Sequence, residues 1–178
     1  MQFNQEALLA AFDSIAHAAI AAGKKLEIAV FGGSALMLAG NFRFTAEDVD
    51  FAALELPWPK WLSGAVTEIA RKNLWSPDWL NDAVAFHLST GANLENDHLL
   101  YGTFHRSGES AGLIVHVPTA EYMLALKLKA IRINDPAKGA SETAGILNLL
   151  KILDISTIDP AMAVLQRFFP RPRNRAAC

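Results

Sequence analysis

Apolar residues recur at helical spacing along several parts of the chain. Between residues 5 and 22 they fall three or four positions apart, as on one face of a helix, and Gly23 follows as the expected C′ residue. The same kind of pattern predicts further helices at about 35–39, 60–73, 77–85, 119–132, 141–152 and 160–169.

Short apolar runs bounded by turn residues indicate strands. They lie at residues 26–31, 49–54, 98–104 and 111–117. The last two are separated by Ser107-Gly108-Glu109, which predicts a turn. This order of elements favours an α+β fold with a small mixed sheet flanked by helices and a helical C-terminal part. We expect a single domain over residues 1–178, with the sheet in about 1–118 and helices in about 119–170.

The composition excludes several classes of protein. The chain has 178 residues, of which 52% are hydrophobic, so a disordered chain is excluded. With 16 basic and 18 acidic residues, it is no chain-wide polycation for nucleic acid. Cys178 is the single cysteine, which excludes a disulfide framework and a cysteine-based zinc site. Because we find neither a basic leader nor a long apolar run, we expect a soluble cytoplasmic protein with no membrane partner.

The segment Gly32-Gly33-Ser34 lies where a predicted strand meets a predicted helix. Glycines allow a phosphate to approach the backbone closely, and a helix N-terminus favours an anion. The alternative is an ordinary strand-to-helix turn in which Ser34 is the N-cap. The segment alone does not decide between the two.

Asp48 and Asp50 are two positions apart at the start of the second predicted strand, so in extended backbone both should face the same way, opposite Val49 and Phe51. Two carboxylates on one face repel each other unless solvent or a cation lies between them. Mg²⁺ prefers such oxygen ligands together with substrate phosphates. The alternative is an exposed strand face, although Asp is disfavoured in strands.

Lys127 falls near the middle of an apolar arc when residues 119–132 are drawn as a helix, for which Thr119 is the expected N-cap. An ammonium in that position is costly unless it has a partner. One interpretation is a functional lysine, and the other is a side chain whose stem packs while its head reaches water. Four tryptophans lie between residues 58 and 79, where we expect packing of helices on the sheet rather than base stacking.

Taken together, these motifs resemble the nucleotidyltransferase fold of polymerase-β-like enzymes. More narrowly, the chain is similar to bacterial nucleotidyltransferases of the AbiEii toxin type and their uncharacterised relatives, over about residues 25–153. The similarity is carried by GGSAL at 32–36, Arg43-Phe44-Thr45, DVDF at 48–51, DWLNDA at 78–83 and VPTAEYMLALKL at 117–128.

The resemblance implies a Mg²⁺- or Mn²⁺-dependent enzyme that moves a nucleoside monophosphate from an NTP to an acceptor hydroxyl. The acceptor is expected to be tRNA or another RNA, in a toxin–antitoxin or phage-defence setting with a cognate antitoxin protein. Asp48 and Asp50 would hold the metal, and Lys127 would contact the nucleotide phosphates. Nucleotide binding is further assigned to Gly32, Gly33 and Ser34.

The sequence departs from this family at the third carboxylate. The strand at 111–117 offers only His116 at that place, while Asp97 and Glu95 are expected in a loop. After the lysine helix, Glu142 stands where the relatives carry an acidic pair. Two alternatives therefore stay open, namely a nucleotide-binding module that has lost catalysis and a protein-interaction module that docks a partner such as an antitoxin.

Overall fold

The computed structural model describes most of the chain and divides it into two compact units. The described residues are 2–40, 46, 48–53, 58–106, 108, 110–131, 134, 136 and 139–170. The first unit comprises residues 1–87 and 98–118, and the second comprises residues 88–97 and 119–178. The segment Arg43-Phe44-Thr45 and most of the expected turn at 107–109 lie outside the described residues.

The first unit is built on a mixed five-stranded sheet in the order β3-β2-β1-β5-β4. Its strands are β1 (Leu26–Val30), β2 (Val49–Ala53), β3 (Leu80–Asn81), β4 (His98–Phe104) and β5 (Leu113–Pro118). The central strand β1 runs antiparallel to β2 and parallel to β5. At the two edges, β3 is parallel to β2 and β4 is antiparallel to β5. The expected α+β fold with a small mixed sheet flanked by helices is confirmed.

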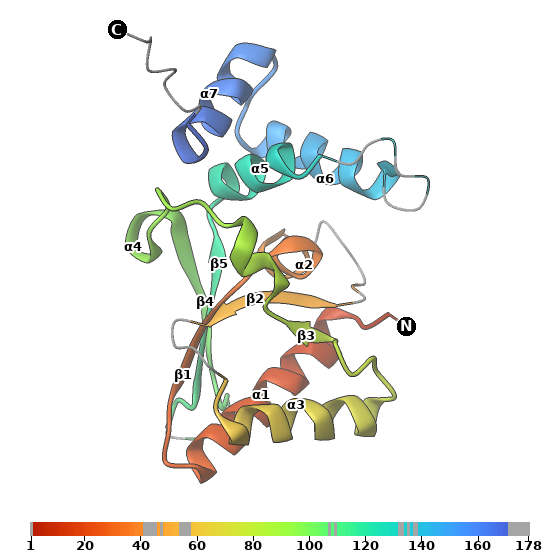
Figure 1. Cartoon of the computed structure of the whole chain (residues 1–178), viewed down its shortest axis with the longest axis vertical. Coiled ribbons are helices and arrows are strands. Elements are labelled where there is room, and N and C mark those ends of the chain that lie inside the picture. Colours follow the sequence, from red (N-terminus) through yellow and green to blue (C-terminus); the bar gives the residue numbers. More distant parts are fainter. Residues whose placement is uncertain are drawn as a thin grey trace, which may run out of the picture. The chain divides into compact units, whose positions relative to one another are not determined.

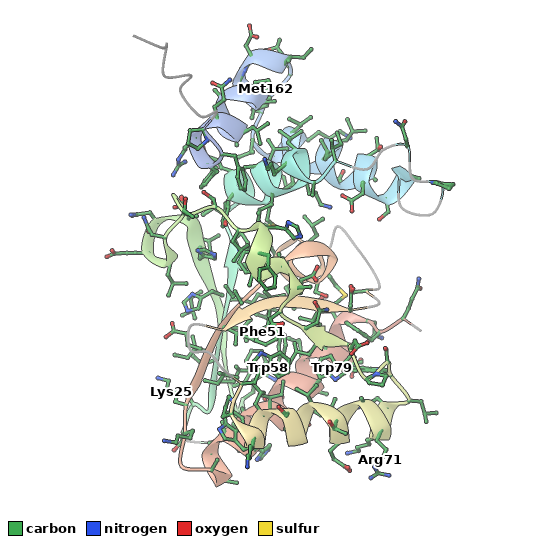
Figure 2. All side chains as sticks on the ribbon, in the orientation of Figure 1. Lys25, Phe51, Trp58, Arg71, Trp79 and Met162 are labelled. Carbon is green, nitrogen blue, oxygen red and sulfur yellow. The ribbon has the colours of Figure 1, made fainter. Side chains whose placement is uncertain are left out.

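Two long helices, α1 (Gln5–Ala21) and α3 (Lys60–Asn73), lie along the same side of the sheet (Figure 1). The layer between them and the sheet holds large buried side chains. Figure 2 labels Phe51, Trp58 and Trp79 there, and the rings of Phe51 and Trp58 are 4.9 Å apart. Trp79 is fully buried and its indole N–H donates to the Val66 carbonyl of α3 at 3.1 Å. Trp79 therefore packs in the core and the half-buried Trp58 packs against Phe51, as expected.

Two shorter elements complete the first unit. The helix α2 (Gly32–Gly40) follows β1 directly and packs against β2 and β5. The 3₁₀ helix η1 (Ala83–His87) follows β3 and packs against β2. The sequence-based prediction of a helix over 77–85 is therefore wrong, because its first half contains β3 and its second half is the start of η1. The predicted helix at 35–39 is correct in kind but begins earlier, at Gly32.

The second unit is helical. It contains α4 (Leu94–Asp97), α5 (Ala120–Lys129), α6 (Gly139–Ile152) and α7 (Ile158–Phe168). Both α6 and α7 pack against α5. Thr119 is the N-cap of α5, and its hydroxyl accepts from the Tyr122 amide at 3.4 Å, as predicted.

The segment 88–97 is held in this unit by hydrogen bonds. The Ser89 amide donates to the Tyr122 hydroxyl at 3.0 Å, and burial raises the pKa of that hydroxyl.

Among the described residues, every helix is too short or too polar to cross a lipid bilayer.

Candidate functional site

The turn between β1 and α2 strongly favours glycine at position 32. Gly32 has a φ of +63°, in the left-handed region that other residues rarely adopt. A Cβ atom added to Gly32 would lie 2.6 Å from Oδ2 of Asp50, which is closer than real Cβ atoms approach an oxygen. The Asp50 carboxylate therefore lies directly against the backbone at the start of α2.

Asp50 lies in β2 and Asp48 directly precedes it, and the burial pattern of residues 48–51 puts the two acids on one side. Val49 and Phe51 are fully buried, whereas Asp48 is exposed and Asp50 is half-buried, which is the alternation expected of a strand. A backbone hydrogen bond attaches Asp50 to the residue before α2, because the Phe31 amide donates to the Asp50 carbonyl at 2.8 Å. The carboxylate pair and the glycine turn thus form one local structure.

Ser34 does not cap α2, because the helix begins two residues before it. Its side chain is fully buried, and its hydroxyl donates to the Asp48 carbonyl at 2.7 Å. This hydrogen bond joins the first turn of α2 to the residue that precedes β2. Ser34 therefore positions Asp48, and the assignment of nucleotide binding to Ser34 stays a prediction.

The neighbouring strand adds a residue that the sequence did not single out. Asn81 of β3 is the partner of Asp50 in the parallel register, so the two residues lie side by side on the same face. The Asn81 side-chain oxygen accepts from the Ala83 amide at 3.1 Å, which fixes the start of η1. The polar Asn81-Asp82 pair after an apolar residue was the available signal, but the helical pattern assigned to 77–85 concealed it.

His116 forms a hydrogen bond with Glu27, an acid that the sequence pattern did not indicate. Its Nε2 atom lies 2.7 Å from Oε1 of Glu27, on the adjacent parallel strand β1. Ala29 is paired with His116 on one side and with Ala52 on the other, so His116 shares a face with Asp50. The strand spacing puts the Cα atoms of His116 and Asp50 roughly 12 Å apart.

Lys127 belongs to the second unit, where its ammonium nitrogen lies 2.9 Å from Oε2 of Glu142. The two side chains are 13% and 19% exposed, respectively. The partner that a lysine in an apolar arc requires is thus Glu142 of α6. The contact of Lys127 with phosphate stays a prediction.

Asp97, one of the acids considered as a third ligand, has a structural role in the second unit. It is 3% exposed, and Arg167 donates to its carboxylate at 2.8 Å. The same carboxylate accepts from the Asn93 amide at 3.0 Å. Arg167 also contacts Glu121, so one guanidinium ties α7 to α5 and to the end of α4.

The donor set fits a hard divalent cation only in part. Within the described ranges, no three His, Cys, Asp or Glu side chains gather where they could hold a metal ion. Asp48 and Asp50 alone provide two carboxylates on one face, and Mg²⁺ commonly binds through one or two carboxylates, waters and substrate phosphates. These residues therefore fit an ion that arrives with a phosphorylated ligand.

Comparison of the chain with protein-family models, with curated protein sequences and with solved structures finds no match.

Proposed function

We propose that the first unit binds a nucleoside triphosphate with Mg²⁺ or Mn²⁺ at Asp48 and Asp50, and transfers its nucleoside monophosphate to an acceptor hydroxyl. The observation that carries the proposal is the contact between Asp50 and Gly32. It joins a carboxylate to a helix N-terminus, and the positive end of the helix dipole favours the phosphate that a metal would bridge to the acid.

In the proposed reaction, the acceptor oxygen forms a bond to the α-phosphorus. The bond from that phosphorus to the oxygen bridging the β-phosphate breaks, and pyrophosphate leaves with the electron pair. The hydroxyl proton passes to water. A bound divalent ion would lower the pKa of the attacking hydroxyl and neutralise charge on the leaving group.

In this proposal the residues of the chain hold and orient the metal ion and the nucleotide phosphates. Asp48 and Asp50 present oxygen atoms from one face of β2, and Ser34 holds the Asp48 backbone through its 2.7 Å hydrogen bond. Gly32 is exposed and Gly33 is half-buried, so a phosphate bridged by the metal to Asp50 could approach the start of α2 from solvent. The role of Lys127 at the nucleotide phosphates rests on the resemblance alone, and in the second unit its ammonium pairs with Glu142.

The resemblance extends the proposal to an RNA acceptor, with tRNA as the first candidate, and to an antitoxin as protein partner. A second candidate function is nucleotide binding without transfer. It is favoured by the pairing of His116 with Glu27 and by the lack of a third metal-binding side chain among the described residues.

The test is transfer of label from each of the four α-³²P-labelled NTPs to total RNA in the presence of Mg²⁺. We expect labelled RNA with the wild-type protein, background with Asp50→Asn, and full labelling with the control Asp78→Asn, which alters an exposed acid of the same unit. A rise in the unfolding temperature with Mg²⁺ and nucleotide, without labelled product, would favour the binding module. If neither labelling nor stabilisation occurs, both functions are wrong.

A further inference from the structure

Phe86 is the most exposed large apolar side chain in the described part of the chain, at 90%. It belongs to the short helix η1, in which the smaller apolar residue Val84 is half-buried. Val84 therefore anchors the turn, while the aromatic ring is presented to the surface.

The short helix η1, which carries Phe86, is fixed next to β2, the strand that contains Asp50. Asn81 lies beside Asp50 in the register, and η1 itself packs against β2. The Ala85 amide donates to the Asp82 carbonyl at 2.9 Å, which closes the first turn. A fixed turn loses little further freedom when a ligand contacts it.

The chain path limits the distance between Asp50 and Phe86. One strand spacing, two extended residues and three residues of a 3₁₀ helix allow their Cα atoms to be at most about 18 Å apart. The contact of η1 with β2 shortens this path. A ribose and a triphosphate chain can cover such a span, so a base could reach the ring while its phosphates are at the carboxylates.

We propose that Phe86 stacks on the base of the nucleotide whose phosphates are bound at Asp48 and Asp50. The inference rests on the proposed nucleotide site and deepens it, since it assigns the specificity for a base-bearing triphosphate over a bare polyphosphate. Because every base has a π face, stacking on Phe86 accepts all four bases, and the ring favours neither purine nor pyrimidine by hydrogen bonding.

Calorimetric titration with Mg²⁺–ATP and Mg²⁺–tripolyphosphate tests this inference. With the full-length chain, we expect both ligands to bind and Phe86→Ala to weaken ATP binding about 5- to 150-fold, with tripolyphosphate affinity unchanged. Phe86→Tyr should retain ATP affinity. The control Ile158→Ala removes a 77% exposed side chain from the second unit and should change the affinity for neither ATP nor tripolyphosphate.

The outcomes separate the two proposals. If wild-type protein binds both ligands but Phe86→Ala leaves ATP affinity unchanged, or weakens both ligands equally, the stacking role is wrong while the phosphate site stands. If wild-type protein binds neither ligand, the nucleotide site itself is wrong, and the role of Phe86 is wrong with it. Because the ring is exposed, the unfolding temperature of Phe86→Ala should equal that of the wild type, which shows that the variant is folded.

Discussion

The ammonium of Lys127 and the carboxylate of Glu142 form a 2.9 Å ion pair between α5 and α6, and each side chain is less than one-fifth exposed. The pair explains how a lysine is tolerated within an apolar arc. Its Coulomb energy offsets the cost of removing the two charges from water, so the two residues act on stability as a unit.

Removal of one partner from this pair should destabilise the protein more than removal of both. We expect Lys127→Met and Glu142→Leu each to lower the free energy of unfolding by about 1–3 kcal/mol, because each leaves a largely buried charge without its counter-ion. The double variant should recover part of that loss. Urea unfolding of all four proteins gives the double-mutant cycle, and strictly additive losses would contradict the coupling.

Two glycine substitutions should change stability in opposite directions. Gly32→Ala adds a Cβ that meets Oδ2 of Asp50 at a φ of +63°, so we expect a loss of at least about 1–2 kcal/mol. Gly64 lies inside α3 with no heavy atom within 4 Å of its added Cβ. Gly64→Ala should therefore stabilise the protein by about 0.5–1 kcal/mol. Thermal unfolding measures the stability of both variants. If the two substitutions change stability equally, the backbone conformation and the Asp50 contact do not require glycine at position 32.

The buried hydroxyl of Ser34 should contribute more to stability than an exposed one. Ser34→Ala removes the hydrogen bond to the Asp48 carbonyl, for an expected loss of about 0.5–1.5 kcal/mol. Ser14→Ala removes an exposed hydrogen bond to the Ala10 carbonyl within α1. Because alanine favours helices, that control should be neutral within about 0.5 kcal/mol or stabilising. Equal losses in urea unfolding would contradict a positioning role for Ser34.

The ion pair between Asp13 and Arg106 predicts a pH dependence. Burial raises the pKa of the Asp13 carboxyl, but hydrogen bonds from the Arg106 side chain and backbone, and its charge, together lower that pKa below its ordinary value. Because the folded-state pKa is depressed, the contribution to stability is present above a pH of about 4 and is lost as the pH falls through the folded-state pKa.

Asp13→Asn removes the titrating group, so wild-type protein should be more stable than this variant at neutral pH. The difference in unfolding temperature should shrink as the pH falls below about 4. Unfolding temperatures measured from pH 7 to pH 2.5 check this, and a constant difference over that range would assign the effect to something other than this carboxyl.

The sequence predicted those elements whose local pattern is strong. β1, β2 and β4 lie within one residue or so of their expected bounds wherever they are described, because apolar runs and flanking turn residues mark them. The same holds for Gly23, whose φ of +64° at the end of α1 is what a C′ glycine requires. β3 was missed because a two-residue strand has no periodicity and exists only through its pairing with β2.

For the candidate site, sequence spacing predicted Asp48 and Asp50 on one face, and the alternating burial of residues 48–51 agrees with that prediction, since alternation is a local property of extended backbone. The residues that contact the predicted site residues could not be predicted from local spacing. Glu27 and His116 are 89 positions apart in sequence, and only the parallel register of β1 and β5 brings them together. The burial of Ser34 likewise depends on where α2 begins, which Gly32 and Asp50 decide jointly.

The chain passes from the first unit to the second at His87, returns at His98 and leaves again after Pro118. Neither unit is thus a continuous stretch of sequence, and no single cleavage yields an intact half. A fragment ending at Pro118 would keep residues 88–97 while losing Tyr122, Arg167 and Phe168, whose atoms bond to Ser89 and Asp97. Any attempt to assign activities to separate halves must therefore proceed by point substitution rather than by truncation.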